Sequence, residues 1–274
     1  MKTSSAVLSL AISLALALLP SGVQAQADQQ DLARQILEDD SGVAMHAAAL
    51  AGRMISEGEE IGPELRTALI TVLELQNRAY RKHSEMQHAR LRDPEIERAF
   101  WGEGYIILTR AVVRLRHPET IEALAGALTI GGPPARVLAE FGEEAAPILL
   151  DIAEGEAWEQ AQAMAAMISL RLMIEEPKGA PLSASTLERI QRLARAQLSG
   201  HVEYPEVFDS DRNHVRIPAA ISLALALDDP SLTQLVQALA REPEAIRRLG
   251  IEGAAEIAEI QRGAARELAE RPRR

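Results

Sequence analysis

The sequence contains no cysteine, and only 3% of its 274 residues are aromatic. The absence of cysteine excludes disulfide bonds, and it also excludes the lipid-modified cysteine of a lipoprotein. The fold must therefore be held together by burial of apolar side chains, and 47% of the residues are hydrophobic. Runs in which valine, isoleucine and threonine alternate with polar residues are few, so the sequence predicts an all-α fold.

Several motifs of common enzyme classes are also missing. The chain has no Gly-rich phosphate loop, no GxSxG nucleophile motif and no HExxH zinc motif. Serine, histidine and aspartate all occur, but no spacing places them together. The net charge of −11 makes nucleic acid and anionic membrane surfaces poor partners. We therefore expect no catalytic residue and no cofactor.

The first 25 residues have the three parts of a secretory signal. Lys2 supplies an early cation, an apolar run covers residues 6–19, and small residues favour cleavage after Ala25. An uncleaved membrane anchor is the alternative, but the run is shorter than the roughly 18 residues that a spanning helix needs. We expect an exported protein, periplasmic or secreted, with a single helical repeat domain over residues 26–274.

Residues 213–227, NHVRIPAAISLALAL, predict a helix that is apolar on nearly every side. Such a helix must be covered by neighbours, so we expect a buried inner helix. The following residues, DDPSLTQLVQALAR, predict a turn and a second helix. One helix pair cannot bury its apolar face alone, and it becomes stable only when similar pairs stack beside it.

The rest of the chain contains copies of this pattern. Residues 40–50 repeat its order of acidic residue, valine, paired alanines and leucine, and residues 134–142 do so more loosely. A second pattern is an apolar residue with glycine close behind, then an acidic residue and a new helix, at residues 61–64, 100–103, 141–144 and 249–252. The first three begin about 40 residues apart, a period typical of two-helix arrays.

One segment follows the pattern Asp-x-x-x-Val-Arg-x-x-Ala-Ala, with Asp211, Val215, Arg216, Ala219 and Ala220. This pattern resembles the second-helix signature of HEAT repeats, especially the short bacterial type first noted in phycobilin lyases. The resemblance implies an α-solenoid of stacked antiparallel helix pairs that serves as a binding scaffold and has no catalytic residues. From the length and the period we expect roughly five to six pairs in a right-handed or irregular array.

The resemblance also implies a role for two arginines. In the family, an arginine at the position of Arg216 ties neighbouring repeats together. Arg136 occupies the related position in the looser copy. We expect both side chains to be internal and structural rather than part of a binding surface.

Helix starts are marked by proline at the first helical position. The prolines concerned are Pro63, Pro94, Pro118, Pro230 and Pro243. Asp93 and Asp229 are expected N-caps, and the sequence from Ser185 to Glu188 predicts a capping box. A second inner helix is expected over residues 158–174, with its methionines as core filler. Linkers are expected at residues 175–184 and 198–212.

Residues 199–214, SGHVEYPEVFDSDRNH, are the longest irregular segment that the sequence predicts. Donor atoms for a metal or an acid–base pair come from His201, Glu203, Asp209, Asp211 and His214. The residues from Asp209, with Asp211 and Asn213, begin like a calcium loop, but His214 stands where glycine is required and Ala220 where glutamate is required. A structural interpretation, with Asp211 capping the next helix, is the alternative.

Two groups of residues are candidates for contacting a partner. Tyr204, Phe208 and Asp209 lie in the same irregular segment, and Trp101 and Tyr105 belong to an aromatic group that begins at Phe100. Aromatic side chains anchor many interfaces, so these residues are expected to bind a protein or peptide. The alternative for residues 100–105 is a patch of the core.

The basic block from Arg78 to Arg92 has two interpretations. It could meet an acidic partner, but charged runs of this kind are usually solvated helix faces. His83 and His88 lie five residues apart, which does not match the i, i+4 spacing of helical metal pairs.

We expect an exported, non-catalytic HEAT-like scaffold that binds an unknown protein or peptide on the concave face built by its inner helices. The alternative is a metal-dependent or hydrolytic protein that uses residues 199–214, which requires His201 and His214 on one side of a pocket. A structural envelope component or homo-oligomer is a third hypothesis.

Overall fold

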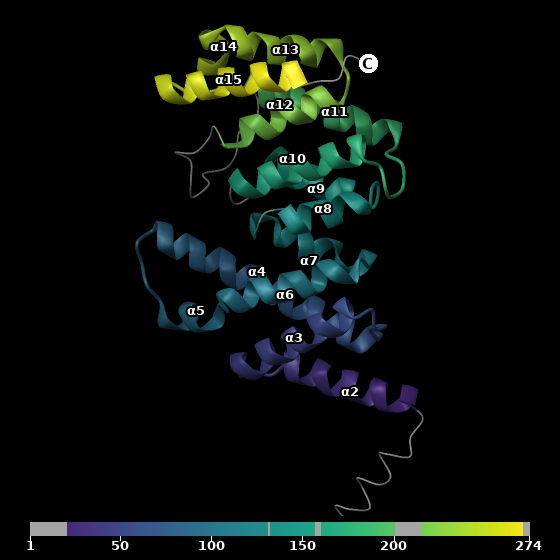
Figure 1. Cartoon of the computed structure of the whole chain (residues 1–274). Helices are drawn as coiled ribbons and strands as arrows, with labels where there is room; N and C mark the ends of the chain where they lie inside the picture. The colour runs from purple at the N-terminus through teal and green to yellow at the C-terminus, as the bar shows by residue number, and fades with distance from the viewer. Residues whose placement is uncertain (1–20, 131, 157–159, 201–214, 271–274) are drawn as a thin grey trace, which may run out of the picture. The chain divides into compact units, whose positions relative to one another are not determined.

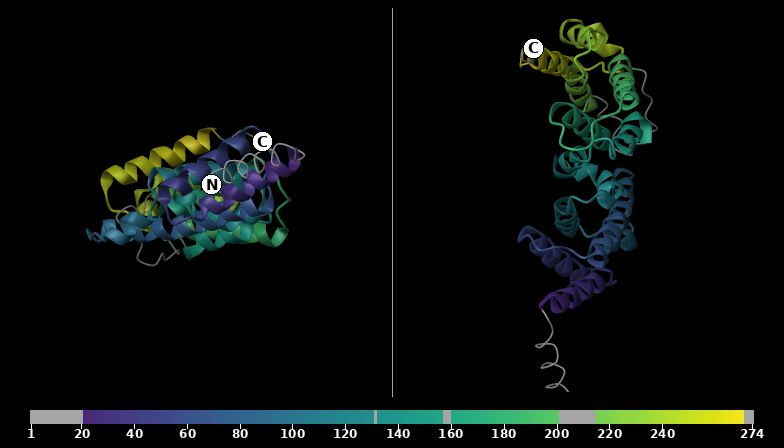
Figure 2. Two further views of the ribbon diagram at one scale, coloured as in Figure 1. Left: turned by 90° about the horizontal axis from the view of Figure 1, so that it is seen from below. Right: turned by 90° about the vertical axis from the view of Figure 1, so that its right-hand side faces the viewer.

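A computed structural model describes residues 21–130, 132–156, 160–200 and 215–270 of this chain. These residues form an all-α protein, as predicted: they are drawn as helices and loops (Figures 1 and 2) and contain no β-strand. An isolated parallel bridge joins Gly142 and Ala180. None of the described helices is long and apolar enough to cross a membrane. Residues 1–20, which include most of the expected signal segment, lie outside the described residues.

The chain divides into two compact units. Unit 1 contains the described residues up to Leu75 together with residues 101–115. Its elements are α2 (Ser21–Ile36), α3 (Ser41–Ser56), the first half of α4 (Pro63–His88) and α6 (Glu103–Leu115).

Unit 2 contains residues 76–100 and the chain from Arg116 onward. After the second half of α4, its α-helices are α5 (Pro94–Ala99), α7 (Ile121–Gly126), α8 (Gly132–Glu140), α9 (Ala146–Asp151), α10 (Gln160–Glu175), α11 (Ala184–Ser199), α12 (Ile217–Ala226), α13 (Pro230–Arg241), α14 (Pro243–Arg247) and α15 (Ala254–Glu270). The short turns η1 (Pro118–Thr120), η2 (Leu128–Ile130) and η3 (Ile152–Glu156) lie between them.

In unit 1, α3 packs against α2 and α6. Its buried face is made of alanines, and such small side chains let helix backbones approach closely. A Cβ placed on Gly52 would lie 3.4 Å from the Cβ of Ala111 in α6. At the end of α3, Arg114 of α6 donates to the Ser56 hydroxyl at 2.5 Å. The first expected copy of the repeat pattern is therefore a helix with a closely packed alanine face.

In unit 2, α10 and α12 lie between other helices (Figure 1) and bury many of their residues. Helix α10 packs against α8, α9 and α12, and α12 also contacts α11, α13 and α15. Buried residues of α12 are Ile217, Ala219, Ala220, Ile221, Leu223, Ala224 and Leu225. Both helices predicted to be inner helices are therefore buried. Helices α11 and α13 are amphipathic and bury one stripe each, since their other faces meet solvent.

The expected helix starts agree with the structure, with one correction. All five prolines occupy the start of a helix or 3₁₀ turn, and the side chains of Asp93 and Asp229 cap α5 and α13. The predicted capping box at Ser185 is wrong, because α11 already begins at Ala184 and its N-cap is Ser183. The Ser183 hydroxyl accepts from the Thr186 N–H at 3.2 Å. Two residues that can cap, Ser183 and Ser185, stand close together, and the helix uses the first.

The recurring glycine pattern also has a physical basis. Gly102, Gly142 and Gly250 have φ values of 56°, 58° and 80°, in the left-handed region that glycine enters most easily. Each lies before a helix, so the chain reverses there before the next helix begins. Gly62 precedes α4 without a positive φ.

The two arginines for which a structural role was expected differ in burial. Arg216 is 8% exposed, and its Nη1 donates to the Gln160 Oε1 of α10 at 3.3 Å. It therefore connects the start of α12 to the neighbouring inner helix, as expected. Arg136 lies on the exposed face of α8, so the internal role predicted for it is wrong. Residues 134–142, the looser copy, have an arginine at the related position, but its side chain is exposed.

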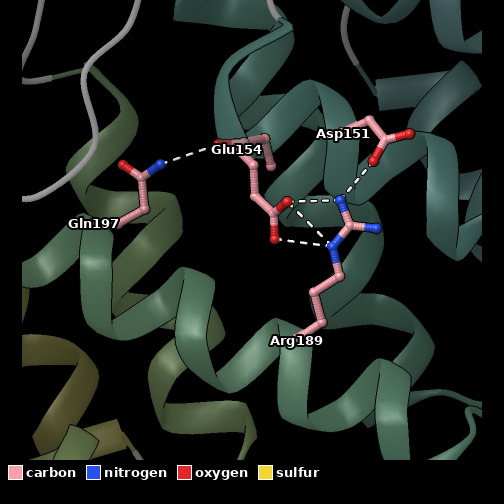
Figure 3. A network of polar contacts seen from close by, with 5 residues as sticks. Asp151, Glu154, Arg189 and Gln197 are labelled. Carbon is pink, nitrogen blue, oxygen red and sulfur yellow. Dashed lines mark hydrogen bonds and ion pairs between the residues drawn. The ribbon is translucent and has the colours of Figure 1, made fainter.

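A polar network joins α11 to the end of α9 (Figure 3). The guanidinium of Arg189 donates to Glu154 at 2.6 to 3.1 Å and to Asp151 at 2.5 Å. Nearby, Gln197 Nε2 donates to the backbone carbonyl of Ala153 at 3.1 Å. The Gln197 contact satisfies a carbonyl near the point where Gly155, with φ 152°, breaks the helical path.

Candidate binding groove

A groove of about 560 Å³ lies between the start of α12 and α15 in unit 2. Its apolar residues are Val215, Pro218 and Ile221 from the α12 side and Ile260 from α15. Ile221 and Ile260 are 1% and 4% exposed, so they form a fixed floor, whereas Pro218 is exposed at the edge. The volume lies in the range of roughly 300–1,000 Å³ that ligand pockets occupy.

Charged side chains of α15 border this floor. Three are acidic, Glu256, Glu259 and Glu267, and two are basic, Arg262 and Arg266. They recur at three- and four-residue spacings, which places them along one side of the helix. No ion pair joins any of them to a described residue. Both signs of charge are therefore available to a ligand along the same groove.

Gly263 lies in the middle of α15 and lines the groove. A glycine inside a helix costs about 1 kcal/mol relative to alanine, so it calls for a local reason. Close packing explains other helical glycines: a Cβ on Gly104 would fall 2.2 Å from Met45 Sδ, and one on Gly126 would fall 2.4 Å from Asn77 Nδ2. A Cβ on Gly263 would meet nothing within 4 Å. The effect of this glycine is to leave the groove open.

The groove combines an apolar floor with charged edges. An apolar floor with charged edges matches the anatomy of an interface core and its polar rim. Among the described residues that line the groove, none is a histidine, serine or threonine. Within the part of the chain that the structure describes, no group of three or more His, Cys, Asp or Glu side chains could hold a metal ion.

The candidate residues of the 199–214 segment lie outside the described residues. These are His201, Glu203, Tyr204, Phe208, Asp209, Asp211 and His214. Their roles in metal binding or partner binding remain predictions.

The aromatic group at residues 100–105 does not form one surface. Tyr105 is 2% exposed and belongs to the core of unit 1, while Trp101 is half-buried just before α6. In unit 2, the ring of Phe100 lies 5.4 Å from that of Tyr80 and 5.1 Å from that of His83. A ligand has better access to Trp101 than to Tyr105, and binding at either residue remains a prediction.

Sequence reasoning did not find the groove. Its lining residues come from two segments about 40 residues apart, and the HEAT-like motif in the first segment gives no sign that α15 packs beside it. The one local signal was Gly263, a glycine inside a helical pattern with charged residues on both sides.

Comparisons of this chain with protein-family models, with curated proteins and with solved structures each found no match.

Proposed function

We propose that this chain is an exported, non-catalytic scaffold of HEAT-like helix pairs that binds a peptide segment of another protein. The observation that carries the proposal is the groove between α12 and α15, which has an apolar floor and charges of both signs that form no ion pair with a described residue. A peptide can place apolar side chains on the floor and polar ones at the edges. A small metabolite would contact only a few of these apolar and charged side chains.

The packing of unit 2 supports the repeat architecture. The inner helices α10 and α12 contact each other, and so do α11 and α13, which are exposed on one face. Arg195 of α11 donates to the Ser231 hydroxyl of α13 at 2.6 Å, which links successive outer helices. Two rows of helices, one buried and one amphipathic, are the arrangement that stacked pairs produce. The buried Arg216, in contact with α10, agrees with the HEAT-like role suggested for it.

Export is proposed on the sequence. The charged, apolar and small-residue regions of the first 25 residues follow the order of a secretory signal. A chain without cysteine also suits an oxidising compartment, because it can form no wrong disulfide there. The proposed location is the periplasm or the extracellular space.

The binding proposal is tested by selecting ligands from a displayed library of random peptides with the chain that begins at Gln26. The test variant is Gly263→Phe, which places a large side chain in the groove at a position where a Cβ meets nothing within 4 Å. The matched control is Gly132→Phe, because Gly132 begins α8 and a Cβ there also meets nothing within 4 Å. Circular dichroism would establish that both variants fold.

We expect the selected peptides to lose at least about tenfold in affinity for Gly263→Phe, since the floor is covered, and to keep their affinity for Gly132→Phe. Equal binding to both variants would place the site elsewhere. A selection that enriches no peptide would contradict the scaffold function itself.

A further inference from the structure

The second half of α4 and the turn after it form a basic region in an acidic protein. Between residues 78 and 92 the cations are Arg78, Arg81, Lys82, Arg90 and Arg92, and the only acidic residue is Glu85. Arg81 pairs with Glu85, with Nε and Oε1 3.1 Å apart. The other four cations form no ion pair with the part of the chain that the structure describes. Without such pairs, these side chains can contact a ligand.

This basic region is held in a defined shape by α5, which folds back beside α4 (Figure 1). Gln76 Nε2 donates to the carbonyl of Ala99 at 3.0 Å at the end of α5. In the connecting turn, the Leu91 N–H donates to the Met86 carbonyl at 2.9 Å. Arg90 has φ 55°, which is uncommon for a residue other than glycine and shows that this turn is tightly constrained.

A pocket of about 570 Å³ lies between the end of α4 and α5. Its cations are Arg90 and Arg92, and Met86, Leu91 and Ile96 supply apolar contact area. Leu91 is 63% exposed, the most exposed of the large hydrophobic side chains described. Leu91 therefore exposes an apolar side chain between Arg90 and Arg92, and neither arginine forms an ion pair with a described residue.

We propose that this pocket binds an acidic peptide segment of another protein, at a surface separate from the groove of α12 and α15. Each guanidinium can donate two parallel hydrogen bonds to one carboxylate. Leu91 and Met86 would pack against an apolar residue beside that carboxylate, and methionine adapts well to differently shaped ligands. Glu97 also lines the pocket and disfavours a ligand with acidic groups on every side.

A peptide fits these features better than an anionic membrane does. A membrane presents a broad surface, and a chain with a net charge of −11 is repelled by it outside the basic region. The pocket is concave and has a limited volume, so it selects individual side chains.

The test uses a fluorescein-labelled peptide in which glutamates flank leucines, and the same peptide with glutamine in place of glutamate. Binding to the chain from Gln26 is followed by fluorescence anisotropy at low and high salt. The variant is Arg90→Gln with Arg92→Gln. The matched control is Arg192→Gln with Arg241→Gln, which removes the same charge from exposed positions of α11 and α13. Leu91→Ser tests the apolar contact, and vesicles of equal parts phosphatidylcholine and phosphatidylglycerol test the membrane.

We expect the glutamate peptide to bind, to bind more weakly as salt rises, and to lose at least about tenfold in affinity with the Arg90 and Arg92 variant. The control variant should bind as the wild type does, and Leu91→Ser should weaken binding without changing its salt dependence.

Equal binding of the glutamine peptide, or an unchanged affinity of the Arg90 and Arg92 variant, would overturn the proposal. Binding to vesicles but not to the peptide would overturn it in favour of a membrane. Because Gly263→Phe leaves this pocket intact, the two binding proposals can fail separately.

Discussion

The carboxylate of Glu143 accepts a hydrogen bond from the backbone N–H of Ser183 at 2.9 Å, across forty residues of sequence. It also accepts from the Thr186 hydroxyl at 2.8 Å. Ser183 is itself the N-cap of α11, so one carboxylate before α9 holds the start of α11. The predicted linker at residues 175–184 is therefore attached to the preceding turn at both Ala180 and Ser183.

The Glu143 contacts predict a pH-dependent stability. The hydrogen bond from Ser183, followed by that from Thr186, lowers the pKa of Glu143 from its usual value. A carboxyl whose pKa is lowered by folding stabilises the protein above its unfolded pKa of about 4.3, and this contribution disappears as pH falls through the lower folded value. Glu143→Gln should cost about 1 kcal/mol at pH near 7, and less in acid.

Urea unfolding of the wild type and Glu143→Gln, measured from neutral pH to below 4, would check this. Glu144→Gln is the control, because Glu144 is exposed and next in sequence. A stability difference that stays constant across this range would show that Glu143 acts by packing rather than by its charge.

Gly142 should tolerate substitution far less than Gly58. Both glycines have positive φ, 58° and 83°. A Cβ on Gly142 would lie 2.2 Å from the carbonyl oxygen of Ala180, which is backbone and cannot rotate away, whereas a Cβ on Gly58 meets nothing within 4 Å. Gly58→Ala should therefore cost about 1 kcal/mol from backbone strain alone. Gly142→Ala should cost at least about 3 kcal/mol, since the clash adds to that strain. Thermal unfolding of both variants measures the difference, and similar losses would disprove the close approach.

The forked shape of the Arg189 guanidinium should contribute more to the stability of unit 2 than its positive charge alone. Its guanidinium contacts Glu154 through two nitrogens and Asp151 through one, and these hydrogen bonds raise its pKa above the usual value. A lysine keeps the charge but cannot make this forked contact. Because the three side chains are partly exposed, Arg189→Lys should destabilise unit 2 by only about 1 kcal/mol. Denaturant titrations at low and high salt would check it. We expect a smaller loss at high salt, and full retention of stability by the lysine variant would contradict the geometric argument.

Gly263→Ala should stabilise the protein. Alanine in a helix interior is favoured over glycine by about 1 kcal/mol, and nothing lies within 4 Å of the added methyl group. Gly126→Ala is the comparison, because its Cβ would displace the Asn77 amide, which donates to the Ala123 carbonyl at 2.8 Å. The melting temperature should rise for Gly263→Ala and fall for Gly126→Ala. A fall for Gly263→Ala would mean that the groove is occupied within the folded chain.

Local sequence patterns predicted helix starts and turns correctly where the residues responsible lie close together in the chain. Proline at the first helical position, an aspartate N-cap and a left-handed glycine each act within one turn of chain, so Pro230, Asp229 and Gly250 could be interpreted without neighbours. The predicted capping box at Ser185 was wrong because it used local sequence alone. The choice between Ser183 and Ser185 depends on Glu143, forty residues away, which holds the Ser183 N–H.

Composition and periodicity by themselves determined that this chain is helical and that the helices at α10 and α12 are buried, because an apolar residue on every side of a helix leaves no face for water. Only the tertiary structure decided which surfaces remain open. Tyr105 and Trp101 look alike in sequence but differ in burial. Gly263 faces open space, while Gly126 faces Asn77, although both are helical glycines. The groove and the basic pocket arise where two segments meet, and their depth depends on backbone separations that no single segment encodes.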